Sequence, residues 1–419
     1  MKQPRNDGVD RRFGQELRRL RMKRGHSLGD LAEFVHYSKG HLSKIENGHA
    51  SPTAPLARAC DTALAAEGRL IALAATDTRP DSGVEAPPGA PWSLRLHPDG
   101  AATFEIGDTP GPAVTAVPPL AAFGTDLVPG LIALFDQARL LGRSASPSLV
   151  LPLVIGQTHV ATAAARRGAA KYRSPLLHHA ARTAEFAGWM AQEAGDNRGA
   201  GWWTEYAVEL ATAAGDSSMV SYSLVRKAVL SMYQADSSAT IALTAQLIGN
   251  STIQPRIRWL GALGAAQGHA LGGDEGNAMR ALERAADLWE RAHRTDPEHH
   301  LGPATLDGRS LLIEAWCHYD LGNLEVAAQL FDEGMAGAAG QSDRDRARFG
   351  TRQALVHAAL GDTARACALI EPLLDIIRAV DSVTIRTDLQ EFHRTVRRSR
   401  DDPALHRIQA ALADTLGKR

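Results

Sequence analysis

Five residues between positions 39 and 47 have the types and the spacing of a surface that reads DNA. In a helix, Lys39, Gly40, Ser43, Lys44 and Asn47 share one face, because residues three or four positions apart are neighbours. This face is short, polar and basic. A lysine on such a face can donate hydrogen bonds to O6 and N7 of a guanine. The pattern therefore predicts a helix that enters the major groove of DNA.

The elements that must position this face are two short helices and a tight turn between Ser27 and Gly48. Ser27 and Ser38 are placed to cap them, because a serine oxygen can accept a free amide of a helix's first turn. The opposite face is apolar at helical spacing, with Leu31, Ala32 and Val35 in the first helix and Leu42 and Ile45 in the second. The predicted DNA-binding set is Ser27, Ser38, Lys39, Gly40, Ser43, Lys44 and Asn47.

From about Phe13 to Ala74 the chain resembles the DNA-binding domain of XRE regulators, the lambda-repressor and Cro-like helix-turn-helix group. The resemblance rests on Leu-Ala in the first motif helix, Leu-Ser in the second and Glu-Asn-Gly after it, with LRRLRMKRG upstream and SPTAPLARACDTALAA downstream. It implies that Lys39, Gly40, Ser43 and Lys44 face the bases. It also implies an ion pair between Arg21 and Glu46.

Two positions depart from this family pattern. Leu28 stands where the family often has a phosphate-binding glutamine, so one backbone contact is expected to be missing. His36 occupies a turn position usually held by glycine, and histidine tolerates the left-handed conformation better than most residues. A motif match alone leaves one alternative, a small helical bundle that does not bind DNA.

Charge is distributed unevenly along the 419 residues. The net charge is −1, but residues 1–50 hold 11 Lys and Arg against 6 Asp and Glu, which leaves −6 for the remainder. A basic end on a mildly acidic body is typical of a protein that meets nucleic acid at one end. Three widely spaced cysteines, Cys60, Cys317 and Cys367, favour reduced thiols and a cytoplasmic protein. No apolar run reaches 18 residues and the N-terminus lacks an apolar core, so we expect neither a membrane span nor a signal peptide.

Three domains are predicted: a five-helix helix-turn-helix bundle over 1–75, a linker over 76–120 and a helical domain over 121–419. The linker is rich in proline, glycine, aspartate and threonine. Within it, 92–97 and 101–106 alternate apolar and polar residues around His-Pro-Asp-Gly, which suits a type I turn. We expect a β-hairpin over 92–106. Because an isolated hairpin is marginal in water, it should dock on its own chain or on a partner chain.

The helical domain shows weak internal repeats. The segment LLIEAWCHYDLGNLEVAAQLFDEG, 311–334, resembles a tetratricopeptide repeat, a helix pair of about 34 residues. AAQGHALGGDEGNAMRALERA and ALVHAALGDTARACALI follow the same template. The predicted fold class is thus all-α, with a C-terminal α-solenoid of degenerate tetratricopeptide-like helix pairs. An irregular helical bundle is the alternative, because the glycine turns at 215, 273, 322 and 361 are spaced unevenly.

The sequence offers candidates for ligand binding but no catalytic motif. Phosphate-binding Gly-x4-Gly-Lys-Ser/Thr, His-Glu-x-x-His, Cys-x-x-Cys and Gly-x-Ser-x-Gly are all absent, so we expect no enzyme, no metal and no cofactor. Aromatic and basic side chains recur in the repeats, where core packing or solvent exposure is the simpler interpretation of each. If they line a groove instead, the effector-binding set is Trp203, Tyr222, Arg226, Arg258, His269 and His318. An arginine would hold a carboxylate or a phosphate.

These features predict a sequence-specific transcriptional regulator. The helical domain would dimerise the chain on a palindromic double-stranded DNA operator and bind a peptide or small-molecule effector. The competing hypothesis is a DNA-anchored scaffold whose repeats bind a protein partner.

Overall fold

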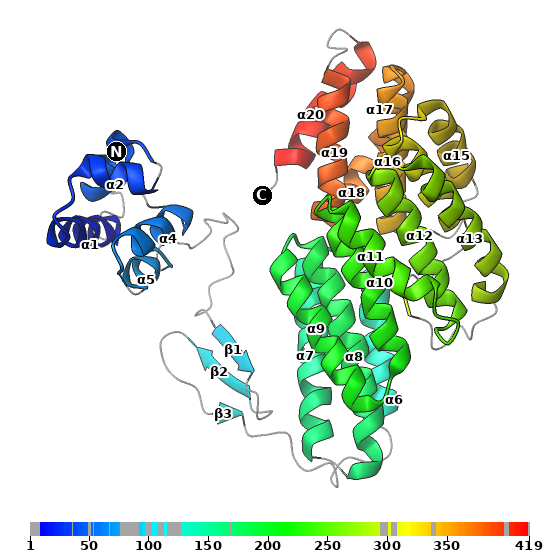
Figure 1. Ribbon diagram of the computed structural model, residues 1–419, viewed down its shortest axis with the longest axis horizontal. Helices are drawn as coiled ribbons and strands as arrows, with labels where there is room; N and C mark the ends of the chain where they lie inside the picture. The colour runs from blue at the N-terminus through cyan, green and yellow to red at the C-terminus, as the bar shows by residue number, and fades with distance from the viewer. Residues whose placement is uncertain are drawn as a thin grey trace. The chain divides into compact units, whose positions relative to one another are not determined.

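The computed structural model describes residues 9–35, 37–48, 52, 54–66, 68–75, 92–96, 102–106, 113–114, 127–167, 169–293, 301–302, 308–336, 341–397 and 402–417. The described chain is predominantly helical and divides into two compact units, Met1–Gly89 and Ala90–Arg419 (Figure 1). The boundary falls inside the predicted linker. The turn residue His36 and the hairpin turn 97–100 lie outside the described residues.

The first unit contains five helices around a core of its own. They are α1 (Val9–Lys23), α2 (Leu28–Val35), α3 (Lys39–Glu46), α4 (Ala54–Ala63) and α5 (Arg69–Ala75). The core combines residues from all five, including Phe13, Leu17, Leu31, Val35, Leu42, Ile45, Leu56, Cys60 and Leu70. These are the apolar faces expected from the helical spacing. Gly25 and Gly48 end α1 and α3 in the left-handed region, with φ of 72° and 70°.

A small antiparallel sheet lies between the helical parts of the sequence. Its strands are β1 (Trp92–Leu96), β2 (Ala102–Ile106) and β3 (Ala113–Val114), in the order β1-β2-β3. Leu94 pairs with Phe104 in the β1–β2 ladder, and Ala102 pairs with Val114 in the β2–β3 ladder. The third strand was not expected from the sequence, because two residues are too few to show alternation.

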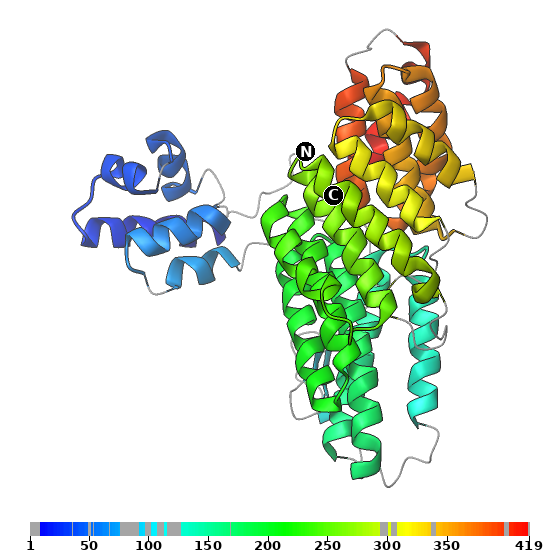
Figure 2. The same cartoon turned by 45° about the vertical axis from the view of Figure 1, so that its right-hand side comes forward.

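The rest of the second unit consists of helices. They are α6 (Leu127–Leu141), α7 (Pro147–Arg167), α8 (Ala170–Glu193), α9 (Asn197–Ala214), α10 (Ser217–Tyr233), α11 (Ser237–Ile248), α12 (Pro255–Leu271), α13 (Glu275–His293), α14 (Arg309–Asp320), α15 (Leu324–Ala336), α16 (Asp343–Ala359), α17 (Thr363–Ile370), η3 (Glu371–Leu373), α18 (Leu374–Val380), α19 (Val383–Val396) and α20 (Pro403–Gly417). In Figures 1 and 2 they progress from α6–α9 at one end to α16–α20 at the other.

From α8 to α17, successive helices pack as neighbouring pairs, α8 with α9, α10 with α11, α12 with α13, α14 with α15 and α16 with α17. The first helices of successive pairs also contact one another, α10 with α12, α12 with α14 and α14 with α16. Small residues permit the close approach within a pair; Ala315 of α14 and Ala327 of α15 are both fully buried beside Phe331. The first helices of the pairs therefore lie side by side in one layer.

The turns between successive helices follow from local chemistry. Gly215 and Gly361 take φ of 76° and 87°, a conformation that costs glycine little. The aspartate after each glycine then caps the next helix: Asp216 accepts the amide of Met219 at 3.0 Å, and Asp362 accepts that of Arg365 at 3.0 Å. The Gly-Asp dipeptides of the sequence thus end one helix and begin the next.

Helix α7 amends the expectation that no segment is suited to a membrane. Among the described residues, it is the one helix long and apolar enough to span a bilayer by length and composition, with 21 residues. One side of α7 packs within the helical domain, since Val150 and Val154 are buried and Thr158 donates to Thr183 Oγ1 of α8 at 2.8 Å. A core helix passes the same composition test. The outer face of α7 is apolar: Leu149, Pro152, Leu153 and Val160 are exposed, and Gly156 between them is half-buried.

Candidate nucleic-acid interface and ligand cavity

The first candidate site is the outer face of α3. Both predicted caps are present: the amide of His41 donates to Ser38 Oγ at 3.2 Å, and the amide of Asp30 donates to Ser27 Oγ at 3.2 Å. Asp30 also accepts the Ser27 amide at 2.7 Å, so Ser27 and Asp30 cap each other reciprocally at the start of α2. The caps fix where each helix of the motif begins. Ser27 and Ser38 are both exposed, at the N-terminal ends where backbone amides attract anions such as phosphate.

The remaining predicted contacts share the solvent-facing side of α3. Lys39, Gly40, Lys44 and Asn47 are exposed and Ser43 is half-buried. A Cβ at Gly40 would meet no atom within 4 Å, so the helix surface is open there to a close approach by another molecule. Asn47 also stabilises the end of the helix, because its side-chain Nδ2 donates to the carbonyl of Ser43 at 2.8 Å.

The buried side of α3 is anchored to α1 by a charge pair and a close contact. Arg21 donates from Nε to Glu46 Oε1 at 2.7 Å and from Nη2 to Oε2 at 2.8 Å, as the family resemblance implied. Hydrogen bonding to Glu46 raises the pKa of Arg21. A Cβ at Gly14 of α1 would lie 2.2 Å from the carbonyl oxygen of Ile45, so the two helices cross where only glycine fits. The sequence reasoning missed Gly14, since nothing local marks a helix crossing.

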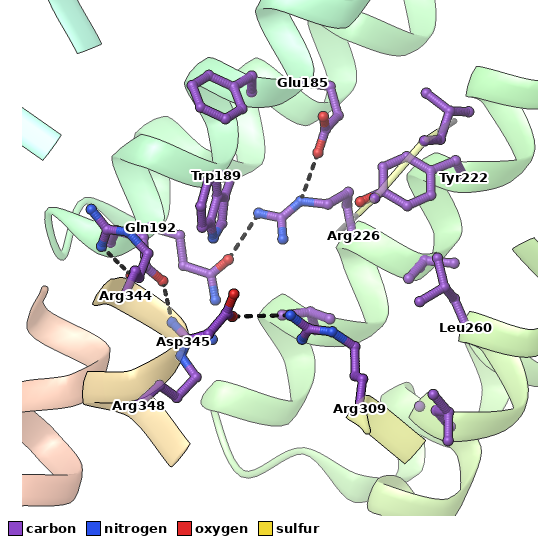
Figure 3. Close-up of a pocket in the computed structure, with 18 of the residues that line it drawn as sticks. Glu185, Trp189, Gln192, Tyr222, Arg226, Leu260, Arg309, Arg344, Asp345 and Arg348 are labelled. Atoms are coloured by element: carbon purple, nitrogen blue, oxygen red, sulfur yellow. Dashed lines mark hydrogen bonds and ion pairs between the residues drawn. The ribbon is translucent and has the colours of Figure 1, made fainter. Parts of the chain in front are cut away.

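The second candidate site is a cavity of about 480 Å³ in the helical domain (Figure 3). Its walls come from α6, α8, α10, α12, α14 and α16, with two threonines of α11. Eight arginines and four acids line it: Arg139, Arg143, Arg182, Arg226, Arg309, Arg344, Arg348 and Arg352, with Asp136, Glu185, Glu193 and Asp345. Aromatic side chains contribute the apolar part, among them Phe135, Phe186, Trp189, Tyr222, Tyr233 and Phe349. The lining is therefore positively charged and aromatic together.

Two of the six residues predicted to bind an effector lie in this cavity, Tyr222 and Arg226 of α10. In Figure 3, Arg226 extends between Glu185 and Gln192 of α8. Its Nη2 donates to Gln192 Oε1 at 2.8 Å, and its Nε lies 3.3 Å from Glu185 Oε1. Burial raises the pKa of Tyr222, so its hydroxyl stays neutral and can donate a hydrogen bond.

The other four predicted residues do not line the cavity, so the six do not form one site. Trp203 of α9 packs against Trp202 and Tyr206, with ring centroids 4.9 and 6.1 Å away. Arg258 donates to the carbonyl of Ile248 at 3.3 Å. His269 lies 3.4 Å from Asp274, and His318 Nδ1 lies 3.4 Å from the amide nitrogen of Asn323. Each of the four contacts residues of its own helix or of a neighbouring turn or helix. The sequence could not show this, because helical spacing alone does not say which face of a helix points inward.

One buried ion cluster in the wall of the cavity was not predicted from the sequence. Glu193, at the end of α8, pairs with Arg344 at 2.8 Å and Arg348 at 2.6 Å, both from α16. Ser382 donates to the same carboxylate at 2.7 Å. Burial alone would raise the pKa of Glu193, but Arg348 and Arg344 together lower it to about 2. Arg344 also donates to the carbonyls of Gly142 and Ala145, at 2.8 and 2.7 Å. The cluster thus joins α8, α16, the start of α19 and the turn after α6.

Comparison with known proteins bears on the first site. Residues 12–74 match a family model described as a helix-turn-helix domain. This match covers α1 to α5 with the exposed face of α3, and it supports a DNA-binding regulator. No curated protein and no solved structure matches the chain.

Proposed function

We propose that this protein is a sequence-specific transcriptional regulator of the XRE type, which reads double-stranded DNA with the exposed face of α3. The observation that carries the proposal is the combination of a matched helix-turn-helix domain with an open, basic helix face bearing Lys39, Gly40 and Lys44. Lysines on such a face reach base edges and phosphates. The caps and the Arg21–Glu46 pair hold this helix in a fixed orientation.

Two copies of the chain would act together on a palindromic operator. A helix-turn-helix domain reads a single half-site, and two-fold proteins read half-sites about 34–36 Å apart. We place the contact between copies on the outer face of α7, which carries no charge from Leu149 to Val160. Leu149 and Leu153 are 68% and 47% exposed, and Gly156 leaves room for a second helix to approach. An exposed apolar stripe of this kind is typical of a contact surface.

The helical domain would also sense an effector, and we place that site in the arginine-lined cavity between its tetratricopeptide-like helix pairs. The cavity is in the size range of small-molecule sites, about 300–1,000 Å³. Because residues of α6, α8, α10, α12, α14 and α16 line the cavity, a ligand there can contact helices from several pairs. Regulation requires two arrangements of these helices and a ligand that binds one of them more tightly. A ligand with equal affinity for both would not shift the equilibrium between them.

The test of DNA reading is to compare Lys44→Ala with the wild type. Operator sequences are first selected from random duplexes with the full-length wild-type protein. If Lys44 contacts a base, the variant loses about 1–3 kcal/mol at the selected site and accepts more sequences at one position. If Lys44 contacts only phosphate, all duplexes weaken equally and the salt slope falls by about 1. The matched control is Lys171→Ala on α8, an exposed lysine outside the helix-turn-helix domain. Unchanged affinity of the Lys44 variant for every duplex contradicts the proposal.

A further inference from the structure

We propose that the cavity binds an organic anion, a carboxylate or a phosphate ester on an apolar body, and that Arg226 holds its acidic group. This inference rests on the proposed effector role and gives that effector a chemical class. It arises from a difference between Arg226 and three other arginines of the lining, Arg309, Arg344 and Arg348.

Arg226 is a buried arginine whose own partners leave it incompletely satisfied. It is 5% exposed, and Nη2 donates to the neutral oxygen of Gln192. Its Nε lies 3.3 Å from Glu185 but has no aligned hydrogen bond. Buried polar groups are nearly always hydrogen-bonded, so the guanidinium of Arg226, which lines the cavity with an N–H unsatisfied, has donor capacity left for a ligand.

Arg344 shows what a purely structural arginine looks like in the same wall. Nε donates to the carbonyl of Gly142, Nη1 to Glu193 and Nη2 to the carbonyl of Ala145, all at 2.7–2.8 Å. Arg348 shares the same carboxylate, and Arg309 pairs with Asp345 at 3.0 Å. These side chains have well-aligned acceptors, so they shape the cavity. Arg226 can gain the most from a ligand.

Glu185 is a weak counter-ion that a ligand can displace. Its side chain is 14% exposed on α8, and it interacts with Arg226 of α10, Arg182 of its own helix and Arg139 of α6. Burial raises the pKa of Glu185 despite these arginines, which shows that its charged form is poorly compensated. An incoming anion beside Arg226 favours the protonated carboxyl further.

The rest of the lining fits an anion with an apolar body. Arginines exceed acids by four, which favours entry and burial of negative charge. Tyr222 is buried on the same helix one turn before Arg226, with its hydroxyl in the cavity wall. Trp189, Phe186 and Leu260 supply apolar contact area around this polar centre. A guanidinium fork among aromatic side chains is the arrangement that recognises a carboxylate or a phosphate on a hydrophobic molecule.

The test uses acids and their isosteric amides as probes of the full-length protein. Naphthoate is compared with naphthamide, and octanoate with octanamide, by isothermal titration calorimetry without DNA. At least one acid should bind with one-to-one stoichiometry and about 10–100-fold more tightly than its amide, because a hydrogen bond to a charged group is at stake. Equal affinity of acid and amide in both pairs, or no binding of either acid, overturns the proposal.

Substitutions then assign the preference to Arg226. Arg226→Gln should abolish the preference for the acid, and Arg226→Lys should keep part of it, since the charge remains without the fork. Arg198→Gln on the exposed surface of α9 is the matched control and should keep the full preference. Circular dichroism establishes that each variant is folded. An acid preference that persists in a folded Arg226→Gln variant moves the anion elsewhere and overturns the assignment.

The outcome is separable from the fate of the proposed regulator. Because the titrations contain no DNA, failed anion binding leaves the Lys44 experiment on DNA reading untouched. If the acid binds as expected but operator affinity does not change in its presence, the anion site stands and its regulatory coupling fails.

Discussion

Arg21 and Glu46 form a two-pronged ion pair between α1 and the end of α3. Their side chains are only 12% and 6% exposed. Arg21 also donates from Nη1 to the carbonyl of His26 at 2.9 Å, so one guanidinium ties α1, the turn after it and α3 together. The pair is largely buried, whereas Lys39 and Lys44 of α3 are exposed. It therefore positions the DNA-reading face without contributing to it.

Glu46→Ala should destabilise the helix-turn-helix domain. It leaves the buried guanidinium of Arg21 without a counter-charge, and breaking a buried pair in this way costs about 3–5 kcal/mol. Thermal unfolding of residues 1–89, which contain a complete core, measures the loss. Glu16→Ala breaks the exposed pair with Arg19 and serves as the control, with little change expected. An unmoved melting curve for Glu46→Ala contradicts the structural role of the pair.

Two glycines of the same domain should respond in opposite ways to alanine. Gly14→Ala places a methyl group against the carbonyl of Ile45, so α1 and α3 must separate and stability falls. Gly40→Ala meets open space and improves helix propensity by at most about 1 kcal/mol. Gly40→Ala should nevertheless weaken operator binding, because its methyl group projects from the face that meets DNA. Denaturant unfolding and DNA titration of both variants test this contrast, and equal behaviour refutes it.

Glu193→Gln should destabilise the helical domain in a pH-dependent manner. The folded pKa of Glu193 is about 2, below its ordinary value of 4.5, so its ionised form stabilises the fold above about pH 4.5. This contribution, about 3 kcal/mol for a shift of that size, is lost as the pH falls through the folded pKa. The difference in unfolding free energy between wild type and variant should thus shrink between about pH 4.5 and about pH 2. A constant difference across that range contradicts the ion cluster.

Leu153→Glu on the outer face of α7 should separate the proposed dimer. The substituted side chain is 47% exposed in one copy, so the fold tolerates the charge, whereas an apolar contact between two copies does not. Sedimentation velocity of the full chain should show a dimer for the wild type and a monomer for the variant. Val326→Glu on α15, an exposed apolar residue elsewhere at 44%, is the control and should remain dimeric. A monomeric wild type contradicts the proposed dimer, and a Leu153→Glu variant that stays dimeric moves the interface away from α7.

The local features of this protein could be predicted from the sequence because their causes lie within a few residues. A serine three positions before a free amide becomes a cap, as Ser27 and Ser38 do. A glycine at a helix end adopts positive φ, as at Gly25 and Gly48. The polar face of α3 followed from helical periodicity alone. The Arg21–Glu46 pair is a long-range contact, and the sequence yielded it only through resemblance to a family with the same residues.

The cavity and the ion cluster were decided by tertiary structure. Glu193 and Arg344 are 151 residues apart, and no local pattern specifies that α8 and α16 meet. Periodicity shows that a helix has a polar face but not whether that face turns inward, so Tyr222 and Arg226 reached the cavity while His269 and His318 did not. The burial that makes Arg226 a candidate anion site exists only after helices that are far apart in the sequence have packed together. Burial removes the guanidinium from water, and this desolvation depends on neighbours in space and not on neighbours in the chain.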